Sequence, residues 1–367
     1  MFTNQNKYRN HSYFMRLALT QARKNLGKTN ENPSVGCVIT KNNSVISVGC
    51  TSISGRPHAE YNAINQFRTN LGDAELYVTL EPCSYYGKTQ PCTNLIEKSG
   101  VKKVFFSIND PDLGSYDKCS KILRNKKISV KKGTCAPELN SFYRSYIKSK
   151  RSLLPFVTCK LAISKDFFTI NKKSKWITNK FSGGRVHLMR SNHDCIMTSC
   201  KTIIKDNSSL TCRIKGLESR SPSRIILDKN LKIPLDSKII KVVNHNHTII
   251  FYNKFNKKKV KQLKKLRIKL LKLPIDIDGN LDLREALIKA KELGFFRIFL
   301  ESGMRLTTNF LRKNLVDDLN LFMSNKNLGK NGKNNIKKQL KLFLKNKKSI
   351  NEKVNLFGEK LITYKIK

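Results

Sequence analysis

One short stretch of the chain contains an imidazole, two thiols and a spare carboxylate. His58-Ala59-Glu60 is followed by Glu81-Pro82-Cys83 and then by Pro91-Cys92. Three protein ligands leave the fourth tetrahedral position of Zn²⁺ free for a water, as in catalytic zinc sites, whereas structural sites are closed by four ligands. The sequence therefore predicts that His58, Cys83 and Cys92 bind a catalytic zinc ion.

Glu60 lies two residues after the predicted histidine ligand and is expected to stay unbound. Zinc can lower the pKa of its bound water toward about 7, so that a hydroxide nucleophile exists at neutral pH. Release of an amine as ammonia also needs a group that carries a proton from this water to a ring nitrogen and then to the leaving amine. The set of residues predicts hydrolytic deamination, with Glu60 as the catalytic residue.

The predicted ligands need two helix starts and one strand end to bring them together. Apolar residues recur with a helical period after His58, so His58 and Glu60 are expected to open a helix. Residues 76–80 predict a buried strand that runs into a turn at Cys83, and residues 92–97 predict the next helix. We expect the metal where this strand end meets the two helix starts.

The remaining patterns predict a helix-flanked sheet in each half of the chain. Further helices are expected at 13–22, 138–148 and 182–190, and further strands at 35–40, 45–49, 104–108, 155–164, 195–199, 223–228, 247–252, 296–302 and 318–323. The basic cluster from Lys148 to Arg151, closed by Pro155, predicts a boundary between a domain 1–150 and a domain 151–367. The fold class is therefore α/β with two domains.

The chain is strongly basic, with a formal net charge of +46 from 72 Lys+Arg and 26 Asp+Glu. Two lysine-rich segments, 256–273 and 325–349, have few aromatic residues and arginines, so they lack the stacking platforms and forked donors of nucleic-acid sites. We interpret the lysines as solvated faces and loops, and the alternatives left open are attraction of phosphate-bearing small substrates and weak nonspecific RNA binding. The tract 325–349 is expected to be a mobile insertion without a core.

The composition also indicates the cellular compartment in which the protein is expected. The chain has no run of about 20 apolar residues and no secretory segment, so we expect a cytoplasmic protein with no membrane partner. Reduced thiols fit this compartment. A structural role is expected for the other cysteines, Cys37, Cys50, Cys119, Cys135, Cys159, Cys195, Cys200 and Cys212.

Several longer motifs resemble those of one enzyme family. They are ENPSVGCVI (31–39), GRPHAEYNA (55–63), YVTLEPCSYYGKTQPC (77–92), NDPD (109–112) and SKWIT (174–178). Together they resemble the bifunctional riboflavin-biosynthesis enzymes, in which diaminohydroxyphosphoribosylaminopyrimidine deaminase is joined to 5-amino-6-(5-phosphoribosylamino)uracil reductase. Eight residues separate the two cysteines, whereas nucleic-acid deaminases usually have two.

The resemblance implies a cytidine-deaminase-like, three-layer N-terminal domain and a dihydrofolate-reductase-like α/β C-terminal domain. It implies zinc binding by His58, Cys83 and Cys92, proton donation by Glu60, and a pyrimidine contact from Asn32. It further implies NADPH contacts from Ala162, Trp176, Thr202, Asp206, Glu301, Ser302 and Gly303. The ribosyl phosphate substrate would contact Ser174, Arg190, Leu210, Arg213 and Glu301, and two arginines suit a phosphate.

The sequence also departs from the family pattern. The usual SxDG is Ser164-Lys165-Asp166-Phe167, the DDP is Asp206-Asn207-Ser208, and the late Gly-Pro is Gly303-Met304. CSHHG has become CSYYG at 83–87, and residues 113–119 replace a glycine-rich stretch. We expect a bulky Phe167 to crowd the cofactor or the substrate in the reductase half.

The expected function is riboflavin biosynthesis. The enzyme would deaminate 2,5-diamino-6-(5-phosphoribosylamino)pyrimidin-4(3H)-one hydrolytically and then reduce the ribosyl group to ribityl with NADPH. The alternatives are a deaminase with a vestigial reductase domain, and an RNA or nucleoside deaminase. The expected partner is the small pyrimidine ribosyl phosphate rather than a specific nucleic acid, and homo-oligomerisation is left open.

Overall fold

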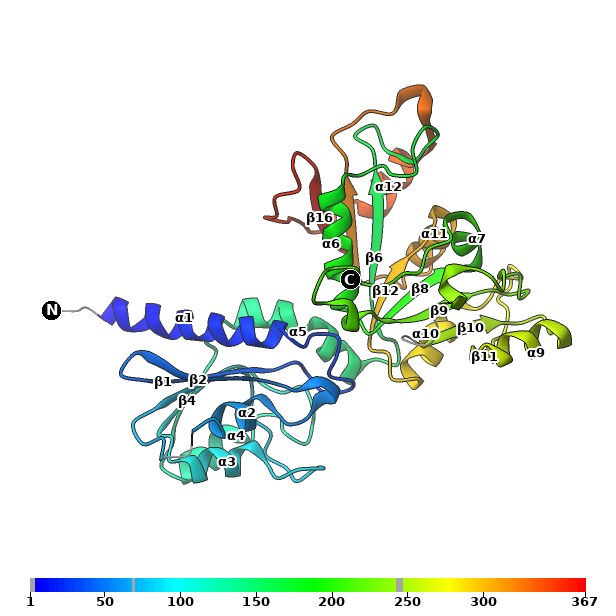
Figure 1. The fold of residues 1–367 in the computed structure, drawn as a ribbon. Helices are drawn as coiled ribbons and strands as arrows, with labels where there is room; N and C mark the ends of the chain where they lie inside the picture. The colour runs from blue at the N-terminus through cyan, green and yellow to red at the C-terminus, as the bar shows by residue number, and fades with distance from the viewer. Residues whose placement is uncertain (1–3, 68–69, 242–246) are drawn as a thin grey trace. The chain divides into compact units, whose positions relative to one another are not determined.

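The chain folds into two compact units, residues 1–152 and 153–367 (Figure 1). The computed structural model describes residues 4–67, 70–241 and 247–367. Within these ranges, none of the helices combines the length and the apolar character that are needed to span a bilayer.

The first unit is built on a five-stranded sheet in the order β2-β1-β3-β4-β5. Its β1 runs antiparallel to β2 and β3, whereas β3, β4 and β5 are parallel. The strands are β1 (Gly36–Lys41), β2 (Ser44–Cys50), β3 (Glu75–Leu80), β4 (Lys103–Ile108) and β5 (Ser129–Lys132). Asn42 and Asn43 form the β1–β2 turn with positive φ, a conformation that asparagine tolerates, and this confirms the predicted hairpin.

Helices cover both faces of this sheet, which gives three layers (Figure 1). One face packs against α1 (Asn4–Arg23) and α5 (Ala136–Arg151). The other carries α2 (Ala59–Ile64), α3 (Cys92–Ser99) and α4 (Cys119–Asn125). A single buried apolar cluster, with Tyr77 and Phe106 among its largest members, joins the layers.

Gly49 of β2 brings α2 close to the sheet. A Cβ atom at this position would lie 2.2 Å from the backbone oxygen of Ala59, the first residue of α2. Because no real Cβ fits at that distance, only glycine allows the start of this helix to approach the strand so closely.

The second unit has a nine-stranded sheet in the order β11-β10-β9-β8-β12-β6-β13-β16-β15. All neighbouring strands from β11 to β13 are parallel, and β16 adds antiparallel pairs with β13 and β15. The strands are β6 (Phe156–Ile163), β8 (Cys195–Ser199), β9 (Ser223–Leu227), β10 (Thr248–Tyr252), β11 (Lys269–Lys272), β12 (Arg297–Glu301), β13 (Asp318–Met323), β15 (Ser349–Asn351) and β16 (Lys360–Lys365).

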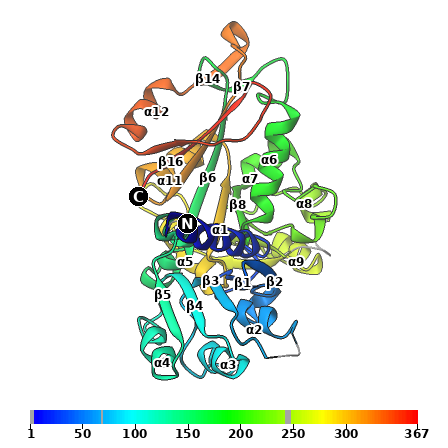
Figure 2. The ribbon, with the colours of Figure 1, turned by 90° about the vertical axis from the view of Figure 1, so that its left-hand side faces the viewer.

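Two apolar clusters cover the two faces of this sheet, as parallel strands require. One face packs against α10 (Leu283–Glu292), α11 (Met304–Arg312) and α12 (Lys337–Leu344). The other packs against α6 (Lys180–Ser191), α7 (Cys200–Asp206), α8 (Lys238–Lys241) and α9 (Lys257–Lys265). Figure 2 shows α11 and α12 on one side of the strands and α6, α7 and α8 on the other.

The prediction of a mobile insertion at 325–349 is wrong. Within this tract, β14 (Gly332–Asn335) pairs with β7 (Phe168–Asn171), and α12 follows it. Ile336 and Leu340 are buried in the core of the second unit, while the lysines of α12 face outward. The lysines therefore lie on the exposed face of an amphipathic helix, and the tract is not a segment without a core.

Candidate active sites

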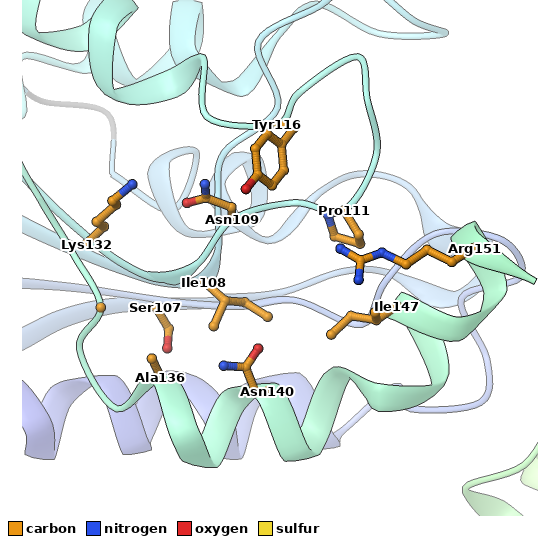
Figure 3. Close-up of a pocket in the computed structure, with 11 residues that line it drawn as sticks. Ser107, Ile108, Asn109, Pro111, Tyr116, Lys132, Ala136, Asn140, Ile147 and Arg151 are labelled. Carbon is orange, nitrogen blue, oxygen red and sulfur yellow. The ribbon is translucent and has the colours of Figure 1, made fainter. Parts of the chain in front are cut away.

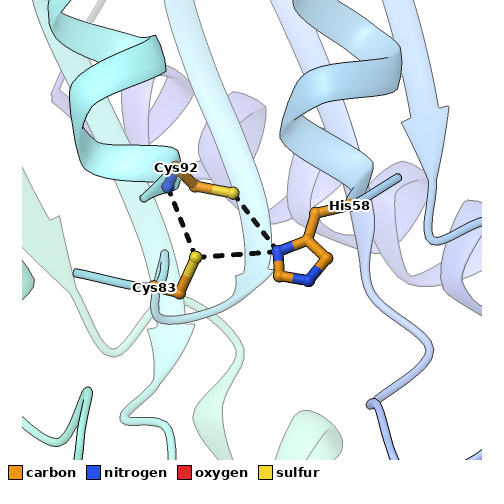
Figure 4. A group of neighbouring side chains, drawn as sticks. All are labelled: His58, Cys83 and Cys92. Carbon is orange, nitrogen blue, oxygen red and sulfur yellow. Dashed lines mark hydrogen bonds between the residues drawn. The ribbon is translucent and has the colours of Figure 1, made fainter. Parts of the chain in front are cut away.

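Three elements of the first unit bring the predicted zinc ligands together (Figure 4). His58 is the extended N-cap of α2, Cys83 follows the carboxyl end of β3, and Cys92 is the first residue of α3. The ligand atoms of the three residues all lie within 4.8 Å of one another. This confirms the expected arrangement of one strand end and two helix starts.

The distances within this group fit a tetrahedral zinc ion. His58 Nδ1 lies 3.6 Å from Cys83 Sγ and 3.4 Å from Cys92 Sγ. Bonds of about 2.3 Å to sulfur and about 2.0–2.1 Å to nitrogen, at a tetrahedral angle, place the two ligand atoms about 3.5 Å apart. Hydrogen bonding to Cys92 lowers the pKa of the Cys83 thiol to about 4, although burial opposes this, so a thiolate is available for a metal.

Glu60 lies beside this group without belonging to it. Its side chain is 4% exposed, in the first turn of α2. Burial raises the pKa of Glu60 to about 7, against the opposing charge of His58. A carboxyl group that is buried next to an open metal position can hold or release a proton near neutral pH.

Asn32 lies in the loop before β1, and its side-chain amide donates to the backbone oxygen of Gly55 at 3.0 Å. It thus braces the segment that leads into His58. A separate cavity of about 370 Å³ lies between the carboxyl end of β4 and α5, and none of the three predicted metal ligands lines it (Figure 3).

In the second unit, Arg190 of α6 and Glu301 at the end of β12 form a buried ion pair. Arg190 Nε and Nη2 donate to the two carboxylate oxygens at 2.9 and 2.7 Å, and Arg190 Nη1 donates to the Thr211 backbone oxygen at 2.9 Å. Burial alone would raise the pKa of Glu301, but the charges and hydrogen bonds of its cationic neighbours lower it to about 2. Arg190 is therefore not a helix-end cation in solvent.

Two residues that the sequence analysis missed adjoin this pair. Lys160 of β6 pairs in register with Glu301, and burial lowers its pKa while the charge of Glu301 opposes this. His187 of α6 accepts the backbone N–H of Arg213 at Nδ1, and burial, with the charges of Arg190 and Arg213, lowers its pKa to about 4. Among 72 Lys+Arg, nothing in the sequence distinguished Lys160.

The other predicted reductase residues lie in two groups. Gly303 donates its backbone N–H to Thr202 Oγ1 at 3.4 Å, and the Ser302 hydroxyl is hydrogen-bonded to the Thr307 hydroxyl of α11 at 3.2 Å. Lys175 Nζ donates to the Asp206 backbone oxygen, which ties the segment of Ser174 and Trp176 to the end of α7. Trp176 is 67% exposed and therefore not a core residue. Leu210 is buried, Ala162 packs against the core from β6, and the Arg213 side chain is exposed.

Gly303 offers a fit for a dinucleotide phosphate. It is the extended N-cap of α11 at the carboxyl end of β12, and no heavy atom lies within 4 Å of the position of a Cβ. Helix starts at the carboxyl ends of parallel strands bind phosphates through their backbone N–H groups.

The side chain of Phe167 is packed against the protein. Its φ of 70° explains why glycine suits this position, yet its ring packs against the core of the second unit and lies beneath Lys337 Nζ. Its backbone oxygen also accepts the N–H of Ile336. Phe167 thus anchors the tract 325–349.

Family models match both units. Residues 8–108 match the cytidine and deoxycytidylate deaminase zinc-binding region, and residues 155–356 match the RibD C-terminal domain. A zinc-binding deaminase unit followed by a reductase unit of the NADPH-dependent type defines a two-part deaminase and reductase.

Comparisons of the whole chain with known proteins agree with the two family models. The riboflavin biosynthesis protein RibD of Aquifex aeolicus is 35% identical, over 94% of this chain and 97% of that protein. The RibD of Actinobacillus pleuropneumoniae is 32% identical, over 86% and 84%. The crystal structure of the deaminase/reductase from Thermotoga maritima has a TM-score of 0.83 at 29% identity, over 98% and 99%. The chain belongs to the riboflavin biosynthesis protein RibD family.

Proposed function

We propose that the chain performs two consecutive steps of riboflavin biosynthesis in the cytoplasm. The domain 1–150 removes the ring amino group of 2,5-diamino-6-(5-phosphoribosylamino)pyrimidin-4(3H)-one as ammonia. The domain 151–367 then reduces the ribosyl group to ribityl. The observation that carries the first step is an open set of three ligands beside an unligated, buried carboxyl group.

In the deaminase domain, His58, Cys83 and Cys92 hold the zinc ion, which when bound polarises the attacking water. Glu60 takes up one proton of the attacking water at its carboxylate and passes it to the ring nitrogen, and it then carries the second proton, from the hydroxyl group at the attacked carbon, to the amine that leaves as ammonia. Its burial keeps bulk water away from this transfer. Asn32 contacts the pyrimidine from the loop that it also braces.

In the reductase domain, NADPH when bound supplies the hydride. Gly303, with Ser302 and Thr202, presents backbone and hydroxyl groups to the cofactor, and Ala162, Trp176 and Asp206 complete its binding site. Arg213 is exposed and binds the substrate phosphate, with Ser174 and Leu210 nearby. Arg190 orients the Glu301 carboxylate toward the substrate, because two of its donors already hold that group.

The test compares Glu60→Gln with the parent protein and with Glu97→Gln, which changes an exposed carboxylate of α3 that pairs with Lys126. We expect Glu60→Gln to keep zinc, measured by metal analysis, and to lose at least 100-fold in ammonia release, since a positioned acid/base group contributes about 10²–10⁴-fold. Glu97→Gln should keep both. Full activity of Glu60→Gln would exclude its role as the proton carrier.

The second step is tested with the deaminated substrate. NADPH oxidation that depends on this substrate, with a ribityl product identified by mass, is the expected result. A folded protein that releases ammonia but oxidises no NADPH would instead be a deaminase with a vestigial reductase domain.

A further inference from the structure

The carboxylate of Glu81 is almost completely buried and accepts three backbone hydrogen bonds. Its Oε2 accepts the N–H groups of Asp110 and Asp117 at 3.1 and 3.0 Å, and its Oε1 accepts the N–H of Cys119 at 3.0 Å. The side chain belongs to a residue that is 2% exposed. All three donors lie in or at the end of the loop 109–118, which connects β4 with α4.

The same loop touches the metal-binding turn at a second point. A Cβ at Gly114 would lie 3.2 Å from the ring of Tyr85, so this ring rests against the loop backbone. Glu81 and Tyr85 stand on either side of the zinc ligand Cys83, two residues before and two residues after it. The position of the loop is therefore linked to the metal centre from both sides of Cys83.

On its other side the loop faces a cavity and is held by side-chain contacts, among them the ion pair of Asp117 with Lys132. The cavity of about 370 Å³ lies between this loop and α5, with Asn109, Pro111 and Tyr116 lining it from the loop (Figure 3). Across the cavity, the loop is tied to α5 by an Asp110–Tyr146 hydrogen bond and by an Asp112–Lys150 ion pair. The ion pair is about one-third exposed, and such pairs contribute little.

From these contacts we propose that Glu81 is a positioning residue of the deaminase site: it fixes the loop 109–118 against the turn that carries Cys83 and Tyr85. This proposal rests on the proposed deaminase activity. Hydrogen bonds to a charged acceptor are stronger than neutral ones, and three on one buried carboxylate define one loop conformation. Glu81 is not a member of the group of three predicted metal ligands, and it acts through the loop.

The experiment uses the full chain with zinc and compares Glu81→Gln with the parent protein. The amide keeps the shape of the side chain but turns one acceptor into a donor that faces a backbone N–H. We expect unchanged zinc content, faster hydrogen exchange confined to residues 109–119, and a KM for deamination that rises about tenfold, which corresponds to about 1.4 kcal/mol. The kcat should change less than threefold, because Glu60 and the ligands are untouched.

Two matched variants control this result. Lys150→Met removes the exposed ion pair of the same loop and should change KM less than twofold. Gly114→Ala pushes the loop from the Tyr85 side and should raise KM with zinc retained, so it tests the loop even if Glu81→Gln does not fold. An equal effect of Lys150→Met would refute the assignment to Glu81.

Other outcomes also overturn the proposal. Loss of zinc from Glu81→Gln would mean that Glu81 supports the ligand turn itself, and a fall in kcat at constant KM would place it in the chemical step. Unchanged exchange of the loop amides would show that Glu81 does not hold the loop. Because exchange needs no activity, a parent protein without deaminase activity would refute the proposed function while the loop is still tested.

Discussion

The buried pair of Arg190 and Glu301 should respond asymmetrically to loss of either partner. The two side chains are 7% and 17% exposed, and removing one member of a buried pair costs about 3–5 kcal/mol, because it leaves a buried charge unpaired. The charge of Lys160 interacts with both partners, so it determines which of the two substitutions lowers the free energy of unfolding more. Glu301→Gln leaves the cations Arg190 and Lys160 next to each other without the carboxylate. Arg190→Gln instead leaves the Glu301 carboxylate with one cationic neighbour, Lys160.

We therefore expect Glu301→Gln to lower the free energy of unfolding of the second unit by about 5 kcal/mol, and Arg190→Gln by about 3 kcal/mol. The double variant Arg190→Leu/Glu301→Leu should be less destabilised than the sum of the two single changes, since the partners are coupled. Urea unfolding followed by circular dichroism measures the loss. Hydrogen exchange in β12 and α6 assigns it to the second unit. Equal losses, or a larger loss for Arg190→Gln, would refute the role given to Lys160.

Two further predictions concern the stability of the protein at low pH and the packing of α2 against its sheet. The pKa of Glu301 lies below its ordinary value of 4.5, so its stabilising contribution is full above about pH 4.5 and is lost as the pH falls toward about 2. Over this pH range, the free energy of unfolding of the parent protein should fall by about 3 kcal/mol more than that of Glu301→Gln. Identical pH profiles of the two proteins would contradict this. Gly49→Ala would place a Cβ 2.2 Å from the Ala59 oxygen, so we expect a loss of at least about 2 kcal/mol in the first unit and weaker zinc retention, whereas Gly183→Ala, which meets no atom within 4 Å, should change neither. A stable Gly49→Ala protein with full zinc would show that α2 can move away from the sheet.

Local patterns were sufficient where neighbouring residues decide the structure. The hairpin of β1 and β2, the strand β3 and the starts of α2 and α3 all follow from periodicity, proline positions and asparagine turns, and so does the convergence of the three predicted zinc ligands. These features need only short-range information, because each ligand sits at the end of an element that its own sequence defines.

Features that depend on distant partners were missed. The ribbon of β7 and β14 joins residues far apart in the chain, and neither strand has a strong pattern of its own. The burial of Lys160 depends on its neighbours β12 and β13, so its type alone indicated a solvated side chain. Glu81 was part of a recognised motif, but its role appears only when the loop 109–118 folds back onto it.

The apolar clusters of the molecule respect the boundary between the two units. The buried members of one cluster lie between Phe14 and Tyr143, and those of the other two lie between Leu154 and Ile366. Each unit therefore has an apolar core made of its own described residues. The division at 152–153 is thus a boundary between two units with separate cores, which is the property of domains that fold as independent units.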